Sequence, residues 1–410
     1  MTMPVERNRD LRLDVFRGLA MLIIFVAHVP GNSWTAYIPA RFGFSSAAEM
    51  FVFCSGYASA LAFGSVFVRR GWWIGTVRIL FRIWQLYWAH VGLFLVLATI
   101  SIVAVRLHIG TRDYPADLSL GVFDRDGLNG IIGMMTLFLV PDLLNILPMY
   151  VILLALTPPA MALSKISPWL VLAASAALWA LVQATGVNLP AGGETGRTWF
   201  FNPFAWQLMF FTGFAFGMSW VPGPAPNHRA LLPIAATVVV LSVPITFWGF
   251  TDTAPALRSI RDWLIPNGVI ATTRLDVLRY AHFLCLAYVA LSLIERFPRA
   301  IAARALAPVV AIGQQSLPAF VSTVALAWVA GIWLDIVGRD SLPVAAVNLF
   351  GFAAILAVAR AAAWFKSAPW AGGSKPDVSR RTTAAPIGFD ERAAGVARAR
   401  SDPTPRLADA

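Results

Sequence analysis

Ten apolar runs recur along the chain, and shorter polar segments that carry charged residues separate them. The runs cover residues 16–33, 45–65, 83–105, 143–163, 168–186, 203–221, 231–250, 275–294, 308–334 and 343–365. A helix needs about 20 apolar residues to cross the hydrocarbon core of a bilayer, and it satisfies its own backbone hydrogen bonds there. The pattern therefore predicts an all-α, polytopic integral membrane bundle of about ten transmembrane helices.

The composition supports a membrane protein and argues against other classes. Of 410 residues 58% are hydrophobic and only 13% are charged, whereas soluble proteins average about 25% charged residues. The net charge of +11 is dispersed over helix ends and the last forty residues, so we expect membrane lipid and no nucleic acid as a partner. Cys54 and Cys285 lie within apolar runs, which indicates neither a disulfide framework nor a metal site.

The ends of the chain indicate an orientation. The first apolar run follows basic residues but no small-x-small cleavage site precedes His28, so we interpret it as a retained helix. More Lys and Arg fall in the segments on the side of the N-terminus, and the positive-inside rule then places both termini in the cytoplasm. Residues 367–410 are rich in Pro, Gly, Ser, Arg and Asp, which predicts a disordered cytoplasmic tail after a membrane domain at 1–366.

Ionisable residues within the first two runs point to chemistry, because such residues are costly in lipid and are by default functional. Arg17 and His28 project from nearly the same helix face, roughly 16 Å apart. A neutral His28 could take a proton from a sugar hydroxyl that attacks an acyl carbonyl, which makes it a candidate catalytic base. Taken alone, such a histidine more often only hydrogen-bonds a neighbouring helix, and it is the neighbouring ionisable residues that favour the catalytic interpretation. Glu49 could orient the imidazole as a carboxylate does in a triad, or could pair with Arg41.

The inner end of the first run suits an anionic donor. The Arg17 guanidinium could grip the phosphates of an acyl-CoA that arrives from the cytoplasm, and Asp14 would pair with Arg17 or Arg12 and hold it. The alternative is plain anchoring by positive charge on the cytoplasmic side.

Further polar residues within the apolar runs predict a substrate cavity. The candidates are His90, Asn145, His282 and Gln314, each of which could instead form an interhelical hydrogen bond worth about 1 kcal/mol. Trp34 lies close to His28 in the sequence and could stack on a sugar ring, although interfacial tryptophans often form an aromatic belt. The chain has no Walker-type loop, no metal-ligand cluster and no serine or cysteine nucleophile elbow. We therefore expect base-assisted acyl transfer with no metal and no permanently bound cofactor.

Several motifs resemble a known family. They are RDLRLDVFRGLAMLIIFVAHVP, GFSSAAEMFVFCSGYASALAFG, ILPMYVILL, FNPFAWQLMFFTGFAFG, RYAHFLCLAY and IGQQSLPAF, which in this order closely resemble the OpgC family of bacterial inner-membrane proteins over residues 9–365. The wider membrane acyltransferase superfamily is marked by an arginine, ten residues and a histidine, as in Arg17 and His28.

The resemblance implies a specific reaction. It is O-succinyl transfer from succinyl-CoA to glucose units of osmoregulated periplasmic glucans, by a multi-pass inner-membrane protein. By position, His28 would be the catalytic base and Arg17 the acyl-CoA contact, while Glu49 falls in the second motif without an assigned role. The family often has an acidic residue before the ILP of the fourth helix, where this chain has Asn145.

Two other functions are open. The first keeps the chemistry but uses another acyl group, such as acetyl, or another cell-envelope glycan. The second is a polysaccharide or solute transporter, since about ten helices with buried polar residues also fit one. Transporters often show inverted repeats, and the sequence has no convincing repeat of that kind.

Overall fold

The computed structural model describes residues 10–110, 112–192, 196–265, 269–301 and 304–370. The chain divides into two units, Met1–Lys366 and Ser367–Ala410, and the description below concerns the first. Residues 371–410, most of the predicted tail, lie outside the described residues. Within the described ranges the fold is all-helical, with a lone bridge between Pro190 and Thr198 in place of any strand. The all-α prediction is confirmed for these ranges.

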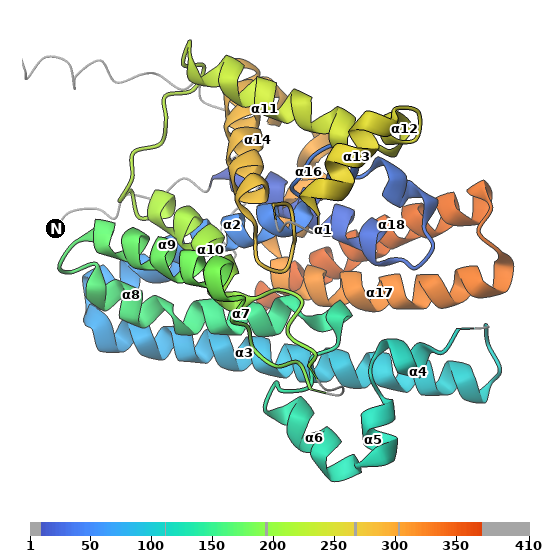
Figure 1. Ribbon diagram of the computed structural model, residues 1–410. Coiled ribbons are helices and arrows are strands. Elements are labelled where there is room, and N and C mark those ends of the chain that lie inside the picture. The colour runs from blue at the N-terminus through green and yellow to red at the C-terminus, as the bar shows by residue number, and fades with distance from the viewer. Residues whose placement is uncertain (1–9, 111, 193–195, 266–268, 302–303, 371–410) are drawn as a thin grey trace, which may run out of the picture. The chain divides into compact units, whose positions relative to one another are not determined.

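The helices follow one another from the N-terminus as Figure 1 shows. They are α1 (Leu11–His28), η1 (Ser33–Tyr37), η2 (Pro39–Arg41), α2 (Ala47–Ser59), η3 (Ala60–Gly64), α3 (Ser65–Arg106), α4 (Tyr114–Asp117), α5 (Gly121–Arg125), α6 (Gly127–Met135), η4 (Asp142–Leu144), α7 (Ile146–Ala155), α8 (Thr157–Leu163), α9 (Pro168–Thr185), α10 (Pro203–Gly217), α11 (Leu231–Thr246), α12 (Trp248–Thr251), α13 (Pro255–Leu264), α14 (Val277–Arg296), α15 (Pro298–Ile301), η5 (Arg304–Leu306), α16 (Ala307–Gln314), α17 (Ser316–Val337) and α18 (Ser341–Lys366).

Six helical segments of the described chain are long and apolar enough to cross a membrane. They are Ala47–Arg106, Ile146–Leu163, Pro168–Thr185, Val277–Arg296, Ser316–Val337 and Ser341–Lys366. The first joins the predicted runs 45–65 and 83–105 through η3, with a kink at Gly71, whose φ of 83° suits glycine. Predicted runs 16–33, 203–221 and 231–250 correspond to α1, α10 and α11, which are not among the six. Ten crossings stay a prediction.

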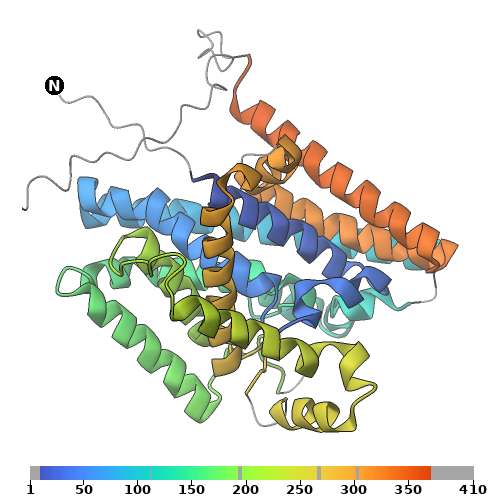
Figure 2. The same cartoon turned by 90° about the horizontal axis from the view of Figure 1, so that it is seen from above.

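Most of the long helices run in similar directions, and α1 lies among them. It packs against α2, α16, α17 and α18. In both Figure 1 and Figure 2, α14 runs across the direction of α3 and α17. The fold is therefore not a simple bundle of parallel and antiparallel rods, and α14 can contact helices from different parts of the chain.

The contact between α1 and α16 depends on two glycines. A Cβ atom on Gly18 would overlap the carbonyl oxygen of Val309, and one on Gly313 would overlap the carbonyl oxygen of Asp14. Small residues let helix backbones approach closely inside membranes, where packing replaces the hydrophobic effect as the driving force. These glycines therefore set how near α16 lies to the polar residues of α1.

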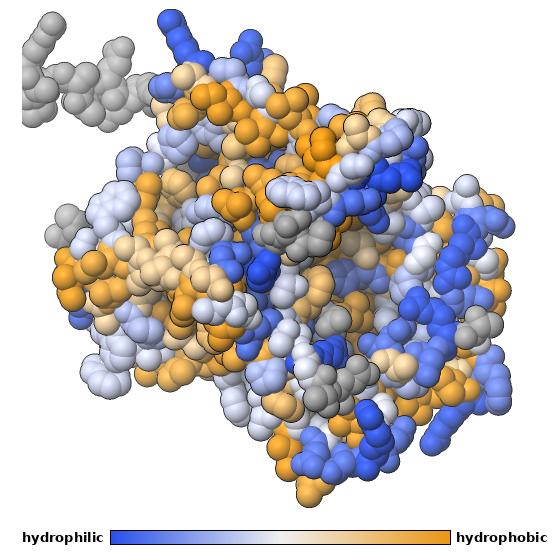
Figure 3. Space-filling model, in the orientation of Figure 1, coloured by the Kyte–Doolittle hydropathy of each residue, from blue (hydrophilic) through white to orange (hydrophobic). Residues whose placement is uncertain are grey.

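Apolar side chains also cover much of the surface. Exposed large hydrophobic residues include Trp169 and Leu181 on α9 and Ile234 and Val240 on α11. Figure 3 shows hydrophobic residues over α9 and α11, whereas hydrophilic residues gather around α4 and α13. This separation fits helices that face lipid and short connecting helices that face water.

Adding one methyl group at the α1–α16 contact tests its importance. We expect Gly313→Ala to lower the melting temperature of the detergent-solubilised protein by several degrees, because overpacking a close contact costs about 1–3 kcal/mol. Gly223→Ala is the control, since a Cβ there meets nothing within 4 Å. Equal melting temperatures for the two variants would contradict the close contact.

Candidate functional site

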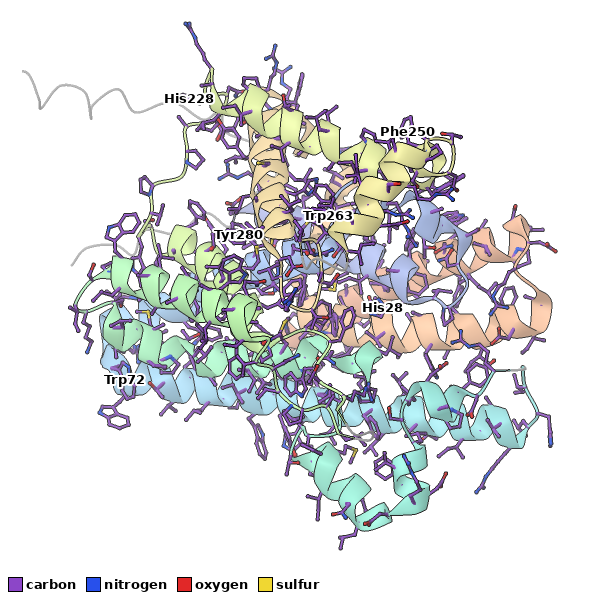
Figure 4. The ribbon with its side chains drawn as sticks, viewed as in Figure 1. His28, Trp72, His228, Phe250, Trp263 and Tyr280 are labelled. Atoms are coloured by element: carbon purple, nitrogen blue, oxygen red, sulfur yellow. The ribbon has the colours of Figure 1, made fainter. Side chains whose placement is uncertain are left out.

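The His28 ring ends α1 and is held in one tautomer. Its Nδ1 lies 2.8 Å from the carbonyl oxygen of Ile24. Since a carbonyl only accepts, Nδ1 carries the proton and donates it, and the neutral ring keeps a lone pair on Nε2. No described residue forms a hydrogen bond with Nε2, and the side chain is half-buried beside α17 (Figure 4). The ring is thus arranged as a proton acceptor.

The turn after His28 is fixed by a pair of buried amides. Asn32 donates from Nδ2 to Asn348 of α18 at 2.9 Å, and Asn348 donates back to Oδ1 of Asn32 at 3.1 Å. Asn32 also donates to the carbonyl oxygen of Val26. Trp34, one of the predicted cavity residues, donates its backbone N–H to Asn32, and its ring packs against Phe352 of α18. These contacts hold the C-terminal end of α1 against α18.

At the other end of α1, the structure brings three predicted residues together. Arg17 donates from Nη2 to the hydroxyl of Ser316, where the break at Gln315 separates α16 from α17. Asp14 is buried and accepts a hydrogen bond from Gln314 at 3.4 Å. Arg17, Asp14 and Gln314 therefore share the junction of α1, α16 and α17.

The Arg17 guanidinium still has an unused donor. Its Nε is buried and has no hydrogen-bond partner in the described part of the chain. Tyr150 of α7, Cys54 of α2 and Arg82 of α3 all lie within electrostatic range of it. A second arginine close by adds positive charge, which suits an anionic ligand at this end. Arg82 is a candidate that the sequence interpretation did not select.

Arg12 lies outside this junction arrangement. It donates from Nε to Asp10 at 3.1 Å and lies 3.6 Å from Glu295 of α14. Its charge is therefore shared with two carboxylates at the start of α1, which fits the anchoring role considered for it.

Glu49 does not make the contacts expected of it. Its Oε2 accepts two hydrogen bonds from Ser46, from the backbone N–H and from the hydroxyl, both at 2.7 Å, which forms a capping box at the start of α2. Its Oε1 accepts from Nε of Arg279 in α14 at 2.8 Å. The carboxylate is therefore engaged by Ser46 and Arg279, whereas the sequence predicts either His28 or Arg41 as its partner.

The physical reason is local capping combined with a distant charge. A buried carboxylate in the first turn of a helix is stabilised by the free backbone N–H groups there, and Arg279 neutralises it. Arg41 instead reaches the carbonyl oxygen of Thr35 at 3.4 Å. We conclude that Glu49 ties α2 to α14 and does not orient His28.

His282 is also a connector between elements. It is buried, with Nδ1 2.8 Å from the hydroxyl of Ser45 and Nε2 3.0 Å from the hydroxyl of Ser242. Phe44 meets the ring edge-on. Both ring nitrogens are thus satisfied, which matches the alternative of an interhelical hydrogen bond between α14, α11 and the segment before α2.

His90 and Asn145 differ from His282 because their polar atoms are buried without partners. His90 in α3 is 1% exposed and Asn145 before α7 is 0% exposed. Both ring nitrogens of His90 and both amide atoms of Asn145 form no hydrogen bond with any described residue. Leaving such groups unpaired costs about 1–3 kcal/mol each, so they call for an explanation.

A further polar cluster near His28 was missed. Tyr114 of α4 and Arg339 both donate hydrogen bonds to Asp335 at the end of α17, and Arg339 lies over Gly31 in the turn after His28. Burial raises the pKa of Tyr114 to about 12, so its hydroxyl stays protonated and donates. The i, i+4 spacing of Asp335 and Arg339 is the signal that could have found this pair.

The buried amide pair can be tested by truncation. We expect Asn348→Ala to lower the stability by about 1–3 kcal/mol, because it leaves the Asn32 amide with fewer partners in a buried position. A looser turn should also displace the His28 ring, so an activity that depends on His28 should fall with it. Melting temperature and turnover are the measurements, with Asn129→Ala, which changes an exposed residue, as the control. If the two variants behave alike, the pair does not hold the turn.

Comparison with known proteins identifies the family of this chain. The family model described as "OpgC protein" matches residues 9–367, nearly the whole chain. No curated protein and no solved structure matches it. The matched region contains α1 with Arg17 and His28 and extends through α18. The chain therefore belongs to the OpgC family.

Proposed function

We propose that this protein is a bacterial inner-membrane O-acyltransferase that moves a succinyl group from succinyl-CoA to glucose hydroxyls of periplasmic glucans. Membership of the OpgC family implies acyltransferase activity and a part in glucan modification. The observation that carries the proposal is the His28 imidazole, which donates through Nδ1 to Ile24 and keeps Nε2 as an acceptor. Arg17 lies on the same helix, at the end where the donor would enter.

In this proposal the distance between Arg17 and His28 along α1 matches the length of the donor's pantetheine arm. Arg17 and His28 are eleven residues apart, or about 16 Å along a helix, and an extended pantetheine arm has about that length. We place both termini in the cytoplasm and propose ten crossings, so that Arg17 faces the donor side and His28 the acceptor side. The nucleotide of coenzyme A would then bind near Arg17 with its acyl end near His28.

The donor end would bind the phosphates of coenzyme A. Arg17 is held by Ser316 through Nη2 and has Nε unused, and Arg82 adds a second positive charge. Guanidinium groups bind phosphates through several N–H groups at once. Asp14, engaged by Gln314, helps to set the geometry of this end.

The reaction at the other end follows from the tautomer of His28. A sugar hydroxyl attacks the thioester carbonyl while Nε2 removes the hydroxyl proton, and a tetrahedral intermediate forms. The intermediate collapses as the C–S bond breaks, and the imidazolium returns the proton to the leaving thiolate. The products are the sugar ester and free coenzyme A. The carbonyl of Ile24 holds Nδ1–H throughout and keeps Nε2 directed to the proton.

Removal of the base tests the chemistry. We expect His28→Ala to lower the transfer rate by about 10²- to 10⁴-fold, the usual contribution of a general base. Mass spectrometry of glucans from cells that express the variant would measure succinyl and acetyl groups separately. His228→Ala is the control, because His228 lies beside the start of α11 (Figure 4) and is exposed. Acylated glucan at the wild-type level would refute the role of His28, and acetyl in place of succinyl would favour the other donor.

Removal of the phosphate contact tests the direction of donor binding. We expect Arg17→Gln to raise the KM for succinyl-CoA at least about tenfold, because hydrogen bonds to charged groups contribute about 1.5–3 kcal/mol. The KM for glucan should change little. Arg106→Gln, at the exposed end of α3, should leave both values unchanged. A rise in the glucan KM alone would show that Arg17 serves the acceptor.

A further inference from the structure

Several buried polar atoms in the described part of the chain have no hydrogen-bond partner. In the described part of the chain they belong to Arg17, His90, Asn145, Trp199, Asp276 and Thr323. His90, Asn145 and Thr323 are at most 1% exposed, and every polar side-chain atom of these three lacks a hydrogen bond. Neither lipid nor the protein satisfies them, so they are suited to a ligand that enters the interior.

Two of these residues lie on neighbouring parallel stretches. Residues 88–96 of α3 and 317–325 of α17 border the same surface groove, so His90 and Thr323 belong to adjoining segments. His90 lies on the buried stripe of α3 with Leu86, Phe94 and Leu97 rather than on the groove. Its ring therefore faces the interior of the bundle, among other buried side chains.

Asn145 adjoins the same interior from α7. This helix packs against α3, and Tyr150, five residues after Asn145, hydrogen-bonds Ser59 of α2 at 3.1 Å. Tyr150 also lies within electrostatic range of Arg17. Asn145 thus immediately precedes a helix that packs beside α3, which carries His90, and that places Tyr150 within electrostatic range of Arg17.

The level of Thr323 follows from two contacts between α17 and α1. Ser316 meets Arg17, and Gly331 lies against Pro30, just beyond His28. The two helices therefore run in the same direction. Thr323 is seven residues after Ser316, about 10 Å along the helix, which places it between the levels of Arg17 and His28.

We propose that His90, Asn145 and Thr323 form hydrogen bonds with the pantetheine arm of the acyl-CoA donor. This inference rests on the proposed function, because it assumes the donor along α1. Pantetheine carries two amides and a hydroxyl, and the three side chains offer an imidazole, an amide and a hydroxyl. Each polar group that lacks a hydrogen bond in the free protein thus has a partner of suitable chemistry in the bound state. Because these groups have no protein partner to give up, their hydrogen bonds with the arm add fully to the binding of the donor.

Apolar replacements separate this role from a structural one. Thr323→Val and Asn145→Leu remove groups that have no partner in the free protein, so the melting temperature without ligand should stay equal or rise. Bound donor should lose hydrogen bonds, and the KM for succinyl-CoA should rise about five- to tenfold for each variant. Thr157→Val is the matched control, because Thr157 is buried but its hydroxyl already donates to Leu153.

Two probes complete the experiment on the full-length protein in detergent. Free coenzyme A should raise the melting temperature of the wild type and of Thr157→Val, but much less that of Thr323→Val and Asn145→Leu. Adenosine 3′,5′-bisphosphate, which has the nucleotide without pantetheine, should shift all four proteins equally.

The remaining outcomes contradict the inference in distinguishable ways. An equal coenzyme A shift in all four proteins would overturn the pantetheine contacts and leave the proposed function intact. No shift in any protein would overturn both, since no donor would bind. A clear loss of melting temperature in Thr323→Val and Asn145→Leu without ligand would show that these groups have structural partners such as buried water.

Discussion

The polar side chains of α1 are surrounded by apolar helices, so most of their polar groups need partners within the protein, and this constraint organises the centre of the fold. Asp14 and Arg17 find theirs in Gln314 and Ser316, on either side of the break between α16 and α17. His28 finds its partner in its own helix. The glycine contact with α16 brings the backbones close enough for Asp14 to meet Gln314 and for Arg17 to meet Ser316. The polar residues of α1 and the helix break therefore depend on each other.

The same constraint separates two kinds of buried polar residue. Glu49 and His282 are fully engaged by other elements, and they hold α2, α11 and α14 together. His90 and Asn145 are equally buried but unpaired. Residues of the first kind stabilise the fold of the free protein, whereas we propose that residues of the second kind gain their partners from a bound ligand. A polar residue in an apolar run can therefore indicate either role, and its partners decide which.

Apolar runs predict where most of the long helices lie, because hydrophobic periodicity is local, although the first run, 16–33, is offset by five residues from α1, Leu11–His28. The contact of Glu49 with Arg279 joins residues from the second and eighth predicted runs, and no local pattern selects that pair. The capping box can be predicted from the sequence, since Ser46 precedes Glu49 by three residues. The Asn32–Asn348 pair depends on how α18 packs against the turn after His28, which hydrophobic periodicity does not specify. Hydrogen bonds and ion pairs between residues far apart in the sequence are thus the features that local patterns do not predict.

The central claim is that the donor lies along α1 with its nucleotide at Arg17 and its acyl group at His28. The most direct measurement is a structure of the protein with a non-reactive thioether analogue of succinyl-CoA. We predict that the phosphates contact Arg17 and that the acyl carbonyl lies beside Nε2 of His28. A donor bound away from α1, or with its nucleotide at the His28 end, would contradict the account.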